Sequence, residues 1–113
     1  HTGFSQGAGI EWELLNEEVM ALYQKGDYDR AVVVAKKALE VAEKNVGPNH
    51  PDVATSLNIL ALLYDAQGQY GQAEPLYKRS LAIREKVLGP DHPNVATGLE
   101  NLAVLYRAMK RSD

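Results

Sequence analysis

The sequence predicts an all-α protein in which antiparallel helical hairpins stack into a solenoid. Three observations carry this prediction: a 42-residue repeat, apolar residues at helical spacing, and glycine or proline near the expected helix ends. No segment alternates apolar and polar residues with a period of two, so we expect no β-strand. A chain of 113 residues has room for one small domain.

The repeat is clearest in the segment 47–64, which returns as 89–106. Within these 18 positions 12 residues are identical, at an offset of 42. The same offset aligns Gly26 with Gly68 and Ala31 with Ala73. The first copy is more degenerate, as is usual for a terminal repeat.

The first hairpin is expected to consist of helices over residues 10–24 and 28–46. Gly26 lies between them, where glycine can adopt the left-handed conformation that ends a helix. Gly47 and Pro48 follow the second helix, and the proline prevents its continuation. The polar, Gly-rich residues 1–9 are interpreted as a flexible arm or the remnant of an expression tag, outside a domain that spans 10–113.

The second hairpin is expected over residues 51–67 and 71–88, and a fifth helix over 93–110 begins a partial third copy. Pro51 and Pro93 suit a first helical turn, where no backbone donor is needed. The repeat units therefore span about 10–50, 51–92 and 93–110. One hairpin cannot bury its own apolar face, so the hairpins must stack, with Tyr70 and Leu81 among the expected core residues.

This pattern resembles the signature of the tetratricopeptide repeat (TPR). The resemblance rests in the second copy on Leu57, Leu60, Ala61, Tyr64, Gly68, Tyr70, Ala73, Tyr77, Ser80 and Leu81. The segments 73–81 and 84–93 resemble more narrowly the kinesin light chain type, whose repeats run to 42 residues. The resemblance implies a right-handed α-solenoid of about two and a half repeats. It also implies a protein–protein interaction scaffold that is not an enzyme.

In the TPR family the first helix of each hairpin lines a concave groove that binds an extended or helical peptide. The resemblance assigns to this groove Glu13, Asn16, Met20, Tyr23, Thr55, Asn58, Leu62, Asp65, Thr97, Glu100, Asn101, Val104 and Arg107. Family asparagines at such positions bind peptide backbone, because an amide offers both donors and an acceptor. Asn58 and Asn101 are therefore the strongest candidates.

The charges on the expected groove helices limit the kinds of peptide that we expect to bind. Residues 10–24 and 51–67 contain no Lys or Arg, which argues against a clamp for a peptide carboxylate and against acidic cargo. With Glu13, Glu17 and Asp65 on or near these helices, we expect a preference for neutral or basic peptides.

Other composition features exclude several function classes. The formal net charge is −3 and Lys and Arg do not cluster, so we expect no nucleic-acid partner. No apolar run approaches the ~18 residues of a membrane span, so we expect no membrane partner. The absence of cysteine excludes disulfides and a thiol nucleophile, and it fits a cytoplasmic protein.

The remaining polar residues have structural interpretations. His50 and His92 occupy equivalent loops, so we interpret them as loop or capping residues rather than metal ligands. Adjacent Glu17 and Glu18 point in different directions on a helix, which does not suit an acid–base pair. Trp12 is expected to pack at the N-terminal end of the stack, with ligand contact as the alternative. We therefore expect no catalytic residue, metal or cofactor.

The fifth predicted helix, 93–110, is apolar around most of its circumference. The third copy stops after this helix, so the surface that a following helix would cover is expected to be exposed and to favour association. Self-association into a homo-oligomer is therefore the alternative function, with Leu102, Leu105 and Met109 as contact residues. The competing interpretation is a fragment of a longer repeat array.

Overall fold

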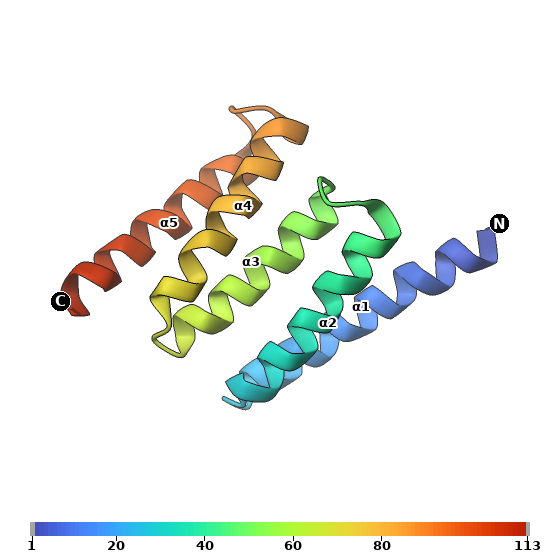
Figure 1. Cartoon of the computed structure of the whole chain (residues 1–113), viewed down its shortest axis with the longest axis horizontal. Helices are drawn as coiled ribbons and strands as arrows, with labels where there is room; N and C mark the ends of the chain where they lie inside the picture. Colours follow the sequence, from blue (N-terminus) through green and yellow to red (C-terminus); the bar gives the residue numbers. More distant parts are fainter. Residues whose placement is uncertain (1, 113) are drawn as a thin grey trace.

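The computed structural model describes residues 2–112, and it describes the side chains of residues 9–110. Five helices follow one another along the chain: α1 Thr2–Gln24, α2 Tyr28–Val46, α3 Pro51–Ala66, α4 Tyr70–Leu88 and α5 Pro93–Ser112. They succeed one another across the molecule from the N-terminus to the C-terminus (Figure 1). The described residues contain no strand, and the all-α fold of about two and a half helical hairpins is confirmed.

The first helix is longer than the sequence predicted. We placed its start at residue 10 and interpreted residues 1–9 as an arm, whereas α1 begins at Thr2. The glycines of this segment do not end the helix, because extending an existing helix costs far less than nucleating a new one, and no proline intervenes. The interpretation as a tag remnant stays a prediction.

Glycine ends the first helix of each complete hairpin in the predicted conformation. Gly26 and Gly68 both have a φ of 77°, in the left-handed region that disfavours residues with a Cβ. A Cβ added at Gly68 would meet no atom within 4 Å, so the requirement for glycine there is conformational and not one of space. The turns between α1 and α2 and between α3 and α4 therefore have one shared geometry.

This geometry gives a paired test by urea denaturation. Gly68→Ala is expected to lower the free energy of unfolding by about 1 kcal/mol, because alanine must adopt a left-handed conformation. Gly71→Ala is the control, since Gly71 lies inside α4 with open space at its Cβ position and no positive φ. It is expected to stabilise the protein by up to about 1 kcal/mol. The same sign for both substitutions would contradict the turn geometry.

The two repeated histidines cap the helices that follow them. The Nδ1 atom of His50 accepts a hydrogen bond from the backbone N–H of Asp52 at 3.0 Å. The Nδ1 atom of His92 accepts the equivalent bond from Asn94 at 3.1 Å. A ring nitrogen that accepts a bond from the first helical turn satisfies one of the donors that a helix N-terminus leaves open. The predicted capping role is confirmed.

The core joins side chains of all five helices. Its main cluster contains alanines at close helix contacts and larger residues that fill the space between them, among the latter Val19, Leu60, Tyr77 and Leu105. Tyr77 on α4 is the largest fully buried side chain among the residues whose side chains are described. Leu81 is buried, as predicted. Tyr70 was also predicted to be a core residue, but it is only half-buried and packs against the edge of the cluster. Tyr70 is the first residue of α4, where the helix end faces solvent.

Polar contacts act both within the second hairpin and between successive hairpins. The buried hydroxyl of Ser80 donates a hydrogen bond to the carbonyl oxygen of Ala54 at 2.8 Å, which holds α4 against α3. The guanidinium of Arg79 lies 2.9 Å from the carboxylate of Glu43, so α4 also contacts α2. The second helices of the hairpins therefore form one layer of the stack.

Candidate binding groove

The first helices of the hairpins, α1, α3 and α5, form the other layer. The indole Nε1 of Trp12 on α1 donates a hydrogen bond to Ser56 Oγ on α3 at 2.7 Å. The amide Nδ2 of Asn101 on α5 donates to Asn58 Oδ1 on α3 at 3.3 Å. These contacts bring together three helices that the chain separates by about 40 residues each, and they confirm the packing predicted for Trp12.

None of the groove residues predicted from the sequence is buried. Seven are exposed: Glu13, Met20, Tyr23, Leu62, Thr97, Val104 and Arg107. Five are half-buried: Asn16, Thr55, Asn58, Asp65 and Asn101. Glu100, the counterpart of Asn58 in the third copy, is exposed. The groove positions are thus accessible to a ligand, and their part in binding stays a prediction.

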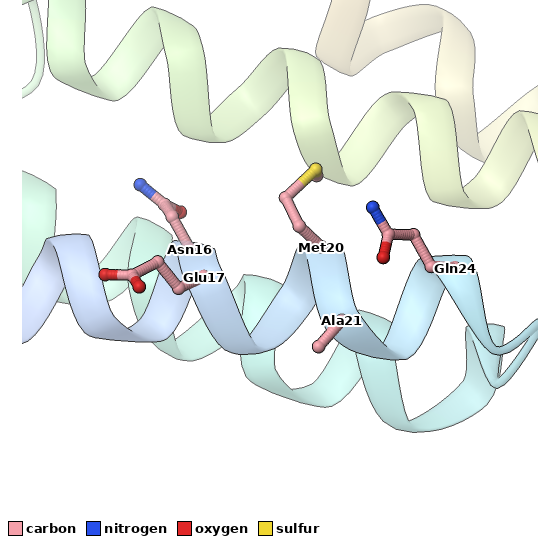
Figure 2. A pocket seen from close by; sticks show the side chains of 5 residues that line it. All are labelled: Asn16, Glu17, Met20, Ala21 and Gln24. Carbon is pink, nitrogen blue, oxygen red and sulfur yellow. The ribbon is translucent and has the colours of Figure 1, made fainter.

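An open pocket of about 410 Å³ lies along α1. It is lined by Asn16, Glu17, Met20, Ala21 and Gln24. Figure 2 shows that the side chains of Asn16, Met20 and Gln24 extend from α1 toward α3. The prediction named Asn16 and Met20 but missed Gln24. Helical spacing could have found it, because Gln24 lies four residues beyond Met20, on the same face.

The two equivalent asparagines of the groove differ in their hydrogen bonds. The Oδ1 atom of Asn58 accepts from Asn101, as described above. The Oδ1 atom of Asn16 is buried and has no hydrogen-bond partner among the described residues. A buried acceptor without a partner costs free energy, and a ligand N–H that reached it would remove this cost. Asn16 is therefore suited to accept a hydrogen bond from a bound peptide.

Four other predicted groove residues have partners within the chain. The ring centroid of Tyr23 lies 5.5 Å from that of Tyr28. Asp65 accepts a hydrogen bond from the hydroxyl of Tyr77 at 3.5 Å. The Thr97 hydroxyl donates to the Pro93 carbonyl at 3.2 Å, and Arg107 Nε donates to the Ala103 carbonyl at 3.4 Å. These contacts restrict the orientations of the four side chains, and Asp65 has a structural role as well.

Known proteins share the sequence pattern and the helical arrangement of this chain. The sequence matches the tetratricopeptide repeat family over residues 13–86 and again over 66–113. The chain belongs to the tetratricopeptide repeat family. Its structure is similar to that of BtubC (BKLC) from P. vanneervenii, with 26% sequence identity and a TM-score of 0.78. The matched region covers 90% of this chain and 39% of BtubC, so the chain corresponds to less than half of that protein.

The similarity to BtubC supports repeats of the kinesin-light-chain-like type. TPR proteins are generally protein–protein interaction modules and are typically non-enzymatic scaffolds. In the part of the chain that the structure describes, no three His, Cys, Asp or Glu side chains are grouped so that they could hold a metal ion. Over the same residues, no helix has both the length and the apolar character needed to cross a membrane.

The residues predicted for self-association of this TPR chain lie mostly on the buried side of α5. Leu102 and Leu105 are 8% and 0% exposed, because their face of α5 packs into the chain's own core. Met109 is half-buried against the same cluster. The structure therefore places both leucines inside the single chain, and their part in contacts between chains stays a prediction. The large apolar residues that α5 does expose are Leu99, Val104 and Tyr106, and self-association itself stays a prediction.

Charge is distributed unevenly over the TPR groove. Neither α1 nor α3 contains a Lys or Arg residue, whereas Glu13 and Glu17 are exposed on α1. The basic side chains of the second hairpin all lie on α4, and two of them, Lys78 and Arg79, are paired with Glu74 and Glu43. The groove between α1 and α3 is therefore acidic in character.

Proposed function

We propose that the face formed by α1, α3 and α5 binds an extended or helical peptide segment of another protein. The observation that carries this proposal is the buried Oδ1 of Asn16, which has no hydrogen-bond partner among the described residues and lies beside an open pocket. The hydrogen-bonded amides of Asn58 and Asn101 lie on the other two groove helices. Amide groups on three successive groove helices offer donors and acceptors along one path.

A peptide in this groove would be bound through its backbone and through apolar side chains. Each residue of an extended peptide presents one N–H and one C=O, and an asparagine amide can bond to either. Met20 and Leu62 are both 42% exposed on the groove helices and supply apolar contact. The absence of cations from α1 and α3 favours neutral or basic sequences, mainly through the association rate and selectivity.

Selection from a display library of random peptides, followed by affinity measurement on the enriched peptides, tests the proposal. We expect enrichment of neutral and basic sequences. Asn16→Ala and Asn58→Ala are each expected to weaken binding about fivefold, the equivalent of one lost hydrogen bond at about 1 kcal/mol. Asn16→Ala is the cleaner variant, because its Oδ1 makes no bond within the described chain, so the substitution should not lower stability.

The matched control is Asn45→Ala, which removes the same side chain from an exposed position on α2, outside the groove layer. It should leave the affinity unchanged. Enriched peptides that are mostly acidic would refute the charge preference. Equal affinities for the parent protein and both groove variants would refute the groove as the binding site.

A further inference from the structure

The groove helices follow one another in register with the 42-residue repeat; we call two residues that this offset relates counterparts. The hydrogen bond between Asn58 and Asn101 joins residues 43 positions apart. The hydrogen bond between Trp12 and Ser56 joins residues 44 positions apart. Both contacts between neighbouring groove helices therefore connect residues close to the repeat offset. Counterparts on neighbouring groove helices consequently lie at nearly the same level of the groove.

Tyr23 on α1 and Asp65 on α3 are counterparts, and the family resemblance assigns both to the groove. Tyr23 is 43% exposed, and its ring packs against that of Tyr28 with the centroids 5.5 Å apart and an interplanar angle of 47°. The contact with Tyr28 restricts the orientation of the ring. The part of Tyr23 that stays exposed is therefore a preformed aromatic surface beside the groove.

The carboxylate of Asp65 is only partly satisfied. It is half-buried, and it accepts a hydrogen bond from the Tyr77 hydroxyl at the long distance of 3.5 Å. An ionised carboxylate can accept about four hydrogen bonds. None of the ion pairs between described residues includes Asp65. Partial burial without a cation is unfavourable for a carboxylate, so a cationic ligand group would be bound favourably at this position.

The Tyr77 hydroxyl lies close to both Tyr23 and Asp65. Burial contributes most to the raised pKa of Tyr77, followed by the charge of Asp65 and their hydrogen bond, and then by Tyr23. Because electrostatic effects weaken with distance, both Asp65 and Tyr23 must lie near this hydroxyl. Side chains from α1, α3 and α4 therefore meet at this level of the groove.

The chain's own cations do not occupy this position. Lys25 lies two positions after Tyr23, and residues two positions apart on a helix do not face the same way. Arg107, the counterpart of Asp65 on α5, donates from Nε to the carbonyl oxygen of Ala103 at 3.4 Å. The aromatic ring and the carboxylate are thus open to a cation that a ligand supplies.

We propose that Tyr23 and Asp65 form a subsite of the groove that binds an arginine side chain of the bound peptide. The planar guanidinium stacks on the exposed part of the Tyr23 ring while its N–H groups donate to the Asp65 carboxylate. A lysine ammonium can pair with the carboxylate but has no plane to stack on the ring, so arginine is preferred. This inference rests on the proposed function, because it specifies one position of the peptide that the groove binds.

The first test changes the ligand. Among peptides enriched on the parent protein from the display library, we expect an arginine at one fixed position. One enriched peptide is synthesised with an acetylated N-terminus, which removes the terminal amine as a second cation, and again with citrulline in place of this arginine. Citrulline keeps the shape but not the charge, so we expect fluorescence anisotropy to show binding on the order of tenfold weaker. Lysine at this position should weaken binding about threefold.

The second test changes the protein. Asp65→Asn should weaken binding of the arginine peptide about fivefold and Tyr23→Leu about threefold, with little change for the citrulline peptide. Tyr23→Phe keeps the ring and should bind like the parent protein. The matched control is Asp52→Asn, which removes the same charge from the first turn of α3, about 20 Å along the helix from Asp65. Salt screens a charge at that distance, so the affinity should not change.

Several outcomes would overturn the subsite. These are enriched peptides without an arginine at a fixed position, equal affinities for the arginine and citrulline peptides, and equal effects of Asp65→Asn and Asp52→Asn. Equal losses for Tyr23→Phe and Tyr23→Leu would refute stacking on the ring. The citrulline comparison leaves the protein unchanged, so its result does not depend on how a variant folds.

Failure of the subsite is distinguishable from failure of the groove. Peptides that depend on Asn16 and Asn58 but not on Asp65 or on an arginine would refute the subsite and leave the groove as the binding site. A library that yields no binding peptide, or peptides insensitive to both Asn16→Ala and Asn58→Ala, would overturn both proposals.

Discussion

Replacement of Tyr77 by alanine is expected to lower the free energy of unfolding by about 3–5 kcal/mol, the range for truncation of a large buried aromatic residue. Tyr77 is 2% exposed and belongs to the cluster that joins all five helices. Its loss would leave a cavity between α3 and α4, the helices of the second hairpin. Urea denaturation followed by circular dichroism measures the change.

Tyr106→Ala is the control of the same chemistry. Tyr106 is 42% exposed and its hydroxyl donates a hydrogen bond to Glu74 at the surface, so we expect a loss of about 1 kcal/mol or less. A similar loss for the two tyrosines would contradict the burial described here. If Tyr77→Ala does not fold, Tyr77→Phe provides the second measurement, because it keeps the ring and removes only the hydroxyl.

Because the Tyr77 hydroxyl is in the protein interior, we also expect the free energy of unfolding to fall at alkaline pH. Burial, together with the charge of Asp65, raises the pKa of Tyr77 above its ordinary value. The unfolded chain loses this proton near pH 10, whereas the folded chain retains it. The contribution of Tyr77 to stability is therefore complete below about pH 10 and is lost as the pH rises through the folded pKa. Tyr77→Phe should remove this part of the pH dependence.

Leu57→Ala is expected to lower the free energy of unfolding by about 2–5 kcal/mol, whereas Leu99→Ala should lower it by less than about 1 kcal/mol. The two leucines are counterparts in the repeat, with nearly the same neighbours in sequence. Leu57 packs against Ile83 of α4 and is 0% exposed, whereas Leu99 on α5 is 54% exposed. The difference therefore measures what a covering helix contributes, since the local helix is the same.

Urea denaturation of the two alanine variants checks this result, and Val104→Ala is a further control on the exposed groove side of α5. A large loss for Leu99→Ala in the isolated chain would show that another part of the molecule covers this leucine.

Much of the fold could be predicted because its determinants are local. The left-handed turns at Gly26 and Gly68 follow from a backbone conformation that glycine adopts without strain. The capping by His50 and His92 involves a residue only two positions away. The 42-residue repeat places these signals at equal intervals, so the order and approximate bounds of five helices could be predicted.

The candidate site was predicted less completely, because it depends on contacts between helices. The resemblance to the TPR family placed Asn16 and Met20 on the groove side of the first helix, but it could not show that the Asn16 oxygen is buried without a partner among the described residues. That property depends on how the helices pack around α1, and the hydrogen bond from Trp12 to Ser56 is one of the contacts that position this helix. The start of α1 at Thr2 was also missed, because glycine content alone does not end a helix that has no breaker.

The sequence by itself determined that this protein is a TPR stack of about two and a half repeats, because periodicity, capping and turn residues act within a few positions of the chain. Only the tertiary structure decided which apolar side of α5 is covered. Leu99, Leu102 and Leu105 are equally apolar, yet Leu102 and Leu105 are buried while Leu99 is exposed. The physical reason is that burial depends on which neighbouring helix is present, and α4 covers only one side of α5.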